Sequence, residues 1–179
     1  MIYTTRYQSP IGELLLAAEN NALIGLWLEK HRYYLNRVKG EVEENDACPV
    51  LLQTKAWLDR YFAGEGPAIS ELQLAPLGSD FQRAVCEIMC NIPYGKVTTY
   101  GEIAKEMALR LGKERMSAQA VGGAVGHNTI SIIIPCHRVV GATGSLTGYG
   151  GGIDNKIWLL KHEGVDMSKL FRPKKTTAP

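Results

Sequence analysis

Long hydrophobic runs, a dense set of cysteines and a large excess of one charge are all missing from this sequence. Because no apolar run has membrane-spanning length and the first residues form no charged leader with an apolar core, we expect neither membrane association nor a secretory signal. The four cysteines, at positions 48, 86, 90 and 136, are spaced too unevenly for a disulfide framework. We therefore expect a cytoplasmic protein whose thiols stay reduced.

Signatures of nucleotide and metal binding are also absent. The Gly-Lys pairs at 95–96 and 112–113 are followed by valine and glutamate, whereas a phosphate-binding P-loop needs serine or threonine there. The glycine-rich segment 148–152 lacks the dinucleotide-binding spacing, and the cysteines at 86 and 90 have no second pair at metal-ligand spacing. We expect no cofactor and no metal, with a metal in the N-terminal part left open.

The charges that are present are distributed unevenly. Residues 1–79 carry seven Lys or Arg and ten Asp or Glu, a net charge of −3, whereas residues 80–179 carry thirteen and eight, a net charge of +5. A basic C-terminal half is suited to facing phosphates. The alternative is that the excess belongs mostly to the C-terminal end, which contains Lys169, Arg172, Lys174 and Lys175.

The first part of the chain has the pattern of a small β-rich unit in a soluble globular protein, with 45% hydrophobic and 21% charged residues overall. Two short apolar runs, 14–18 and 23–28, flank the turn signal Asn20-Asn21 and predict a β-hairpin. An acidic segment, 41–46, predicts an exposed loop. Residues 50–62 then show apolar residues at helical spacing.

After a boundary near residues 75–78 the pattern turns helical. Three helix starts carry capping signals, and the last two helices are short with a brief connection, which predicts a helix-turn-helix. These starts are Ser79 with Gln82, Thr99 with Glu102, and Ser117.

The third of these helices, expected from residue 118 to about 126, is crowded with alanine and glycine. Glycine in a helix costs up to about 1 kcal/mol relative to alanine, so several together indicate a need for close approach. That approach is either to another helix or to a nucleic-acid groove.

The most informative run is residues 132–140. Ile132 to Ile134 predict a short buried strand that Pro135 ends, because proline cannot donate to a ladder. Cys136 follows on rigid backbone, next to a histidine and an arginine whose positive charge favours the nucleophilic thiolate. The alternative is a buried structural cysteine beside a surface histidine.

Cys136 and His137 are adjacent, so in extended backbone their side chains do not simply face each other. A bridging water or a turn is needed to pass the proton. Glu163, which ends an expected helix, can orient His137 in the manner of a catalytic triad. Spacing alone leaves this arrangement one possibility among several.

Taken together, these residues resemble the O6-alkylguanine-DNA alkyltransferases, also called methylated-DNA–protein-cysteine methyltransferases. The match runs from about residue 79 to 164 and is looser before it. The matching segments are Phe81-Gln82, Ile92-Pro93-Tyr94-Gly95, Thr99-Tyr100-Gly101, Ala120-Val121-Gly122, Asn128, the Ile-Pro-Cys-His-Arg-Val run, Gly148-Tyr149, Lys156 and His162-Glu163-Gly164.

The resemblance implies two domains. Residues 1–76 would form an α/β domain with an RNase H-like β-sheet. Residues 77–168 would form a mainly α, winged-helix-like domain that contains the helix-turn-helix, binds DNA and accepts the alkyl group. Residues 169–179 would form a basic, mobile tail.

The resemblance also implies a monomeric suicide repair protein. Cys136 would accept the alkyl group from O6 of a guanine flipped out of double-stranded DNA, approached through the minor groove, and would not be regenerated. His137 would deprotonate Cys136 through a water, and Glu163 would orient His137. Tyr100 would push on the flanking phosphate and protonate the leaving guanine, and Asn128 would brace the turn before the active-site segment.

Further residues follow from the same resemblance. The implied guanine pocket contains Val125, Val139, Tyr149 and Gly150. The implied DNA-contacting residues are Thr99, Arg115, Ser117, Ala118, Gln119, Ala120, Gly122 and Gly123. One departure matters, because Gln119 stands where the family has an intercalating arginine. Either Gln119 or Arg115 would fill the gap left by the flipped base, and weaker DNA binding is expected.

Three other functions compete with this one. A damage sensor of the same fold would lack the acceptor cysteine, and Cys136 is present. A helix-turn-helix transcription factor would carry long polar side chains on the third helix to read the major groove, and those are missing. A cysteine hydrolase would reveal itself by repeated turnover of ester or amide substrates.

Overall fold

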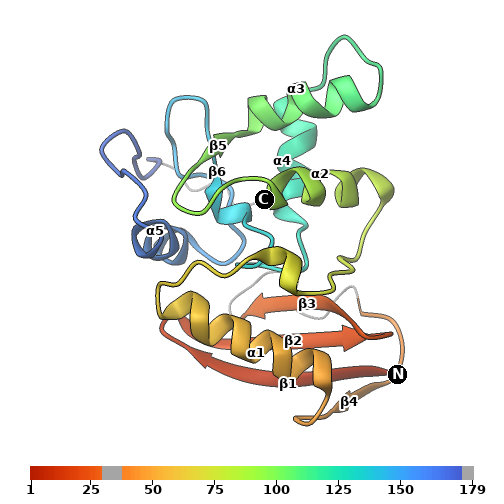
Figure 1. Cartoon of the computed structure of the whole chain (residues 1–179). Coiled ribbons are helices and arrows are strands. Elements are labelled where there is room, and N and C mark those ends of the chain that lie inside the picture. Colours follow the sequence, from red (N-terminus) through yellow and green to blue (C-terminus); the bar gives the residue numbers. More distant parts are fainter. Residues whose placement is uncertain (30–37, 175–179) are drawn as a thin grey trace.

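The computed structural model describes residues 1–29 and 38–174, in which a sheet domain and a mainly helical domain are stacked on each other (Figure 1). The N-terminal sheet has the strand order β3-β2-β1-β4, with antiparallel pairing from β1 to β3 and parallel pairing of β4 with β1. The elements of this domain are β1 (Ile2–Ser9), β2 (Gly12–Glu19), β3 (Ala22–Leu28), β4 (Val42–Glu44), α1 (Pro49–Phe62) and the short 3-10 helix η1 (Ile69–Glu71).

The predicted hairpin is confirmed as β2 and β3. Asn20 and Asn21 have φ angles of 51° and 62°, the left-handed pair that a two-residue type I′ turn requires. Alternate residues of β2 face opposite sides of the sheet, so Leu14 and Leu16 enter the main core whereas Leu15 packs into a smaller cluster on the other face. The predicted helix at 50–62 is confirmed as α1, which packs against the sheet.

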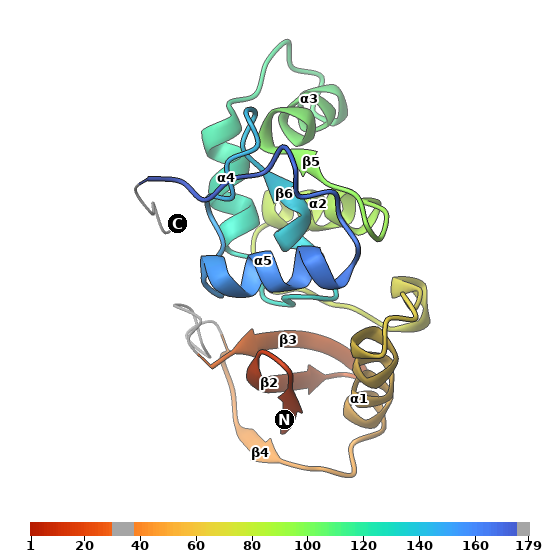
Figure 2. The same ribbon diagram turned by 90° about the vertical axis from the view of Figure 1, so that its left-hand side faces the viewer.

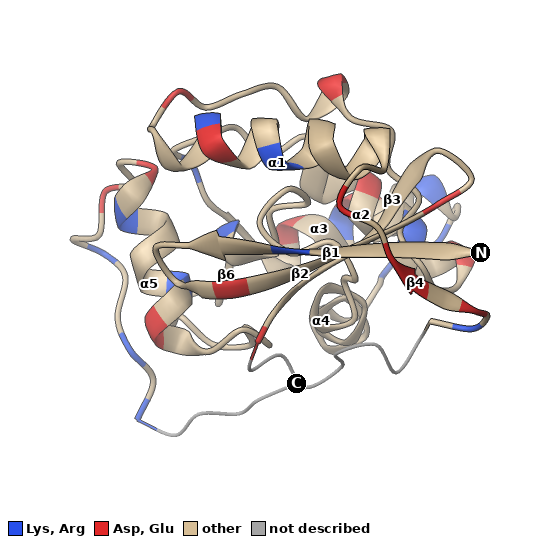
Figure 3. Ribbon diagram, turned by 90° about the horizontal axis from the view of Figure 1, so that it is seen from below, with Lys and Arg blue, Asp and Glu red and all other residues tan. Residues whose placement is uncertain are grey.

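The acidic segment 41–46 is exposed, as predicted, but it is not all loop. Val42 to Glu44 form β4, which pairs with Ile2 to Thr4 at the far edge of the sheet (Figure 3). The sequence did not predict β4, because a three-residue edge strand with no buried side chain leaves no apolar alternation.

The C-terminal domain contains the three predicted helices and adds a small sheet. Its elements are α2 (Asp80–Cys90), β5 (Thr98–Thr99), α3 (Tyr100–Arg110), α4 (Ala118–Gly126), the 3-10 turn η2 (Cys136–Arg138), β6 (Val139–Val140) and α5 (Ile153–His162). Ser79 and Gln82 form a full capping box on α2, and the side chains of Thr99 and Ser117 cap α3 and α4. Helices α3 and α4 form the helix-turn-helix, and β5 pairs in parallel with β6.

The strand predicted at residues 132–134 is wrong. Residues 131–134 form a turn in which Ile132 has a φ of 69°, a conformation that β-branched residues rarely adopt. The side-chain Nδ2 of Asn128 holds this turn closed by donating to the carbonyl oxygens of Ile130 (3.2 Å) and Ile134 (2.9 Å). An apolar run has the same composition in a buried turn as in a buried strand, so local pattern could not separate them.

The segment that leads to this turn is attached to the sheet domain. The Leu26 amide of β3 donates to the Thr129 carbonyl oxygen (2.8 Å), and the Ser131 amide donates back to the Leu26 carbonyl oxygen (3.0 Å). Ile130 thereby extends the sheet beyond β3, which is the strand nearest the helical domain in both views (Figures 1 and 2). One main apolar core runs through both domains.

The beginning of the C-terminal segment is also anchored. The Phe171 amide donates to the Gly144 carbonyl oxygen (3.0 Å), and the Leu146 amide donates to the Phe171 carbonyl oxygen (2.9 Å). The mobile tail was expected from residue 169, so the structure ties down its first residues. Residues 175–179 lie outside the described part, and the domain limits 1–76 and 77–168 stay predictions.

Candidate active site

Cys136 is the first residue of η2, directly after Pro135. It is 7% exposed, and its amide donates to the Ile134 carbonyl oxygen (2.8 Å). The strained Ile132 is completely buried in the same turn, and such backbone costs of order 1–3 kcal/mol and persists only where its surroundings impose it. Asn128 imposes it, because its side-chain Oδ1 also accepts from the Ile130 backbone amide (3.0 Å). The turn therefore presents the sulfur from a fixed backbone.

A buried histidine and carboxylate lie beside the cysteine. His137 Nε2 is 2.5 Å from Glu163 Oε2, although the two residues are 26 positions apart. Both side chains are inaccessible to solvent. Glu163 caps the C-terminal end of α5, and η2 packs against that helix, so the fold brings the predicted pair together.

The protonation states follow from this burial. Burial lowers the pKa of His137, which keeps the imidazole neutral. Burial opposes ionisation of Glu163 as well, but the hydrogen bond with His137 and the charge of Arg138 outweigh it and lower the pKa of Glu163 to about 2. A neutral imidazole beside a carboxylate carries its proton on Nε2, so Nδ1 is the basic nitrogen. Nδ1 has no hydrogen-bond partner among the described residues.

The charge near the sulfur does not come from the residues that the sequence suggested. Arg138 Nε binds Glu163 Oε1 (2.6 Å) and its Nη1 donates to the Ile92 carbonyl oxygen (2.6 Å), while His137 is neutral. Burial raises the pKa of the Cys136 thiol, and the opposing influences are a hydrogen bond from Asn128, the charge of Lys156 and nearby backbone amides. The expectation that adjacent cations ionise the thiol is therefore corrected.

Lys156 is a functional candidate that sequence reasoning left outside the site. It is fully buried on α5, and its Nζ donates to the carbonyl oxygens of Val139 (2.6 Å) and Thr147 (3.0 Å). Burial lowers its pKa to about 8. The sequence did contain a signal for this residue. Lys156 shares the buried stripe of α5 with Leu159 and Leu160 at helical spacing, and a lysine is rarely buried unless it is paired.

Two tyrosines border the same region. The Tyr100 hydroxyl donates to the Thr147 carbonyl oxygen (3.0 Å), and burial raises its pKa. A Cβ on Gly148, whose φ is 84°, would lie 2.5 Å from that hydroxyl, so glycine is required there. The Tyr149 hydroxyl is buried and has no hydrogen-bond partner in the described part of the chain.

The other predicted pocket residues surround this region less directly. Val139 and Val125 are buried on β6 and α4, and Gly150 is half-buried after Tyr149. For Val139, the carbonyl oxygen already accepts from Lys156.

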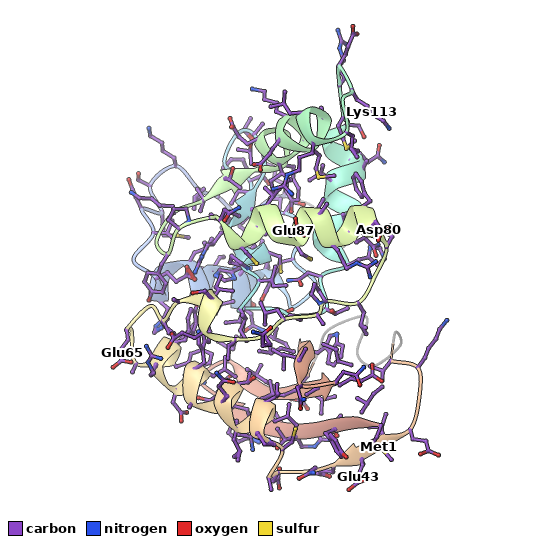
Figure 4. The ribbon with its side chains drawn as sticks, turned by 45° about the vertical axis from the view of Figure 1, so that its right-hand side comes forward. Met1, Glu43, Glu65, Asp80, Glu87 and Lys113 are labelled. Carbon is purple, nitrogen blue, oxygen red and sulfur yellow. The ribbon has the colours of Figure 1, made fainter. Side chains whose placement is uncertain are left out.

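Most of the predicted DNA-contacting residues are exposed and lie in the first turns of α4 or in the connection before it, while Thr99 caps α3. The exposed members are Arg115, Ser117, Ala118, Gln119, Ala120 and Gly123, while Gly122 and Thr99 are half-buried. A Cβ on Gly123 would meet no atom within 4 Å, and one on Gly122 would be 3.9 Å from the Tyr100 ring. Packing against another helix therefore does not explain these glycines. Lys113 lies at the outer end of the α3–α4 connection (Figure 4).

Three further findings concern metal ions, membranes and disulfide bonds. Within residues 1–29 and 38–174, no three His, Cys, Asp or Glu side chains gather closely enough to hold a metal ion. None of the described helices is long and apolar enough to cross a bilayer. All four cysteines are free thiols.

Comparison with known proteins matches both domains. The family model for the 6-O-methylguanine DNA methyltransferase ribonuclease-like domain matches residues 2–76, and that for the DNA-binding domain of the same family matches residues 80–165. The methylated-DNA–protein-cysteine methyltransferase of Haemophilus influenzae is 40% identical over 164 residues, covering 92% of this chain and 87% of the relative. The Mycobacterium leprae protein of the same name is 40% identical over 174 residues, covering 96% and 99%.

Solved structures agree. Mycobacterium tuberculosis OGT in complex with DNA has a TM-score of 0.75 and 38% identity, covering 90% of this chain and 93% of that one. An O6-methylguanine DNA methyltransferase from Methanococcus jannaschii has a TM-score of 0.64 and 30% identity, covering 97% and 100%.

Fold and site together define a two-domain protein in which a helix-turn-helix domain carries a buried cysteine, histidine and glutamate beside a ribonuclease-like sheet domain. The chain belongs to the 6-O-methylguanine DNA methyltransferase family.

Proposed function

We propose that this protein repairs double-stranded DNA by moving the methyl group from O6 of guanine irreversibly to the sulfur of Cys136. One observation carries the proposal: the buried His137–Glu163 pair stands beside a cysteine on a fixed turn, with the basic Nδ1 unengaged by other described residues. A soft thiolate is the nucleophile that attack on a methyl carbon requires. The four free thiols suit a reducing cytoplasm.

The reaction balances without a cofactor. The Cys136 thiol gives its proton through a water to His137 Nδ1, and Glu163 stabilises the imidazolium that forms. The thiolate attacks the methyl carbon, so that a carbon–sulfur bond forms as the bond to guanine O6 breaks. Tyr100 donates a proton to the leaving guanine and is reprotonated in turn from His137. The products are S-methylcysteine and guanine, and no step restores the thiol.

Lys156 favours ionisation of the Cys136 thiol, which burial opposes by raising the thiol pKa. Its buried charge acts on the sulfur, and its two hydrogen bonds fix the backbone at Val139 and at Thr147, two residues before Tyr149. Tyr149, Gly150, Val139 and Val125 would bound the pocket for the guanine.

We propose that a monomer approaches the DNA with α4 in the minor groove. The extruded nucleotide must leave the stack to reach a buried sulfur, as for other chemistry on bases. The small exposed side chains of α4 let its backbone approach the groove closely, since Gly123 faces open space in the free protein. Gln119, or Arg115 beside it, would occupy the gap in the duplex. Ser117, Ala118, Ala120, Gly122 and Thr99 would line the contact.

Mass spectrometry tests this function. After mixing with a duplex that contains O6-methylguanine, the peptide that holds Cys136 should gain one methylene and consumption of the duplex should stop at one equivalent. Cys136→Ser should gain nothing, whereas the control Cys48→Ser, altered in the sheet domain, should react like the parent. Methylation of another cysteine, or continued turnover, would contradict the proposal.

A further inference from the structure

The catalytic carboxylate is contacted from the other domain. The hydroxyl of Tyr61, on α1, donates to Glu163 Oε2 at 2.8 Å, the same oxygen that faces His137 Nε2. Tyr61 and Glu163 are 102 positions apart, and Tyr61 is 1% exposed. A residue of the ribonuclease-like domain therefore belongs to the hydrogen-bond network of the reacting cysteine, although the two domains are matched by separate family models.

We propose that Tyr61 is a positioning residue for methyl transfer, which fixes the Glu163 carboxylate in the orientation that His137 needs and takes up part of the negative charge on Oε2. This inference rests on the proposed function. It assigns the sheet domain a direct part in the chemistry of the helical domain.

The position of the hydroxyl is imposed by packing on every side of the ring. Tyr61 stacks on Trp57 with ring centroids 5.7 Å apart and meets the edge of Tyr94 at 6.2 Å. Its carbonyl oxygen accepts a hydrogen bond from His162 Nε2 (2.8 Å), next to Glu163 in the chain. The ring is thus held between α1 and α5, and its hydroxyl has one buried partner to which it can donate.

The hydroxyl remains a donor under all ordinary conditions. Burial and the neighbouring carboxylate raise the pKa of Tyr61 far above its usual value, so the phenol stays protonated. A buried phenol that only filled space would leave its hydroxyl unsatisfied at a cost of about 1–3 kcal/mol, whereas here it binds a charged acceptor.

Several ionisable groups surround the Glu163 carboxylate. The ionisable groups that face Glu163 are Tyr61 from α1, His137 and Arg138 from η2, Tyr94 from the segment before β5, and Tyr149 from the loop before α5. Tyr61 and His137 both contact Glu163 Oε2. The hydrogen bond from the phenol partly neutralises the negative charge on this oxygen, so the oxygen stabilises a protonated His137 less well. Loss of the phenol hydroxyl should therefore let His137 accept a proton at higher pH and should loosen the carboxylate.

The test compares two substitutions that each remove one phenol hydroxyl bound to a carboxylate. Tyr61→Phe removes the donor to Glu163. The control Tyr7→Phe removes the hydroxyl that donates to Asp59 Oδ1 (2.6 Å) on the outer side of α1. The rate of Cys136 methylation is measured against pH in the full chain, and the His137 imidazole is titrated separately by nitrogen NMR without DNA.

For Tyr61→Phe we expect a transfer rate about threefold to tenfold lower near neutral pH, the loss that one typical intramolecular hydrogen bond produces. The acid limb of the rate profile and the His137 titration should both move to higher pH, and Tyr7→Phe should move neither. An unchanged rate and profile, or a lower rate with an unmoved His137 titration, would overturn the inference. If the parent methylates no cysteine, the proposed function fails, while the NMR titration still decides whether Tyr61 acts on His137.

Discussion

The His137 imidazole separates two sides of the buried centre that differ in how well their polar atoms are satisfied. On the side of the sheet domain, Glu163 is bonded to Tyr61, His137 and Arg138, and Arg138 also donates to a backbone carbonyl oxygen. Around Cys136, by contrast, His137 Nδ1 and the Tyr149 hydroxyl have no partners among the described residues.

The difference shows which side is complete before a ligand arrives. An unsatisfied buried polar atom costs about 1–3 kcal/mol, so each one in a folded protein calls for an explanation. The strained backbone at Ile132 lies on this same side, in the turn that carries Cys136. The polar atoms on the carboxylate side are satisfied within the protein, whereas the sulfur side keeps buried polar atoms with no partner among the described residues.

The largest effect is expected when the hydrogen bonds and the ion pair of Glu163 are disrupted. Glu163→Gln leaves Arg138 buried without its counter-charge and should lower the free energy of unfolding by about 3–5 kcal/mol in urea titrations at neutral pH. The control is Glu87→Gln on the outer face of α2, whose pair with Arg110 (3.0 Å) is exposed and should be worth less than about 1 kcal/mol (Figure 4). Equal losses in the two variants would show that the network is not structural.

The same variant has a pH signature. The folded-state pKa of Glu163 is depressed from 4.5 to about 2, so its contribution to stability is present above pH 4.5 and is lost as the pH falls toward 2. The stability gap between the parent and Glu163→Gln should therefore narrow through that interval, as acid unfolding curves would show. A constant gap would contradict the assignment of an ionised carboxylate.

A smaller effect is expected on the sulfur side. Lys156→Met removes the buried cation that opposes the raised thiol pKa, so reaction of Cys136 with a thiol-specific reagent at pH 7, where Lys156 is mostly protonated, should slow several-fold. Lys161→Met, on the exposed part of the same helix, is the matched control. Identical reagent kinetics in both variants would remove Lys156 from the site.

The smallest effect is expected outside the buried centre. Gln119→Arg adds a cation to the exposed side of α4 and should tighten binding to methylated duplex a few-fold. The gain should shrink as the salt concentration rises, because the slope of log affinity against log salt should steepen by about one. Gln73→Arg, with the same charge on the exposed surface of the sheet domain, should bind like the parent. If Gln119→Arg changes neither affinity nor transfer rate, the expectation of weakened DNA binding is wrong.

Much of the fold was readable from local chemistry. The Asn-Asn turn, the capping serines and threonine, and the apolar stripes of α1 and α2 are signals contained within a few residues. The turn at 131–134 was not readable, because it depends on a side chain at Asn128 bridging two carbonyl oxygens. The strand β4 was missed because it buries nothing.

The site divides in the same way. Cys136, His137 and Glu163 were singled out from the residue pattern and were given roles in alkyl transfer by the resemblance; the structure brings them together, while those roles stay predictions. Local pattern placed Tyr61 only in the apolar stripe of α1, since nothing near it in sequence points to Glu163. The ion pair between Arg138 and Glu163 likewise could not be predicted from the sequence. Arg138 was therefore expected to act on the Cys136 sulfur, its neighbour but one in the chain.

The pairing of Leu26 with residues 129–131 has a consequence for synthesis. When the sheet domain has left the ribosome, residues 129–131, which pair with Leu26 of β3, have not yet been synthesised. The backbone amide and carbonyl of Leu26 are then unpaired at the edge of the sheet. Edges of that kind recruit other chains, and nascent or truncated copies of this protein are the form most exposed to aggregation.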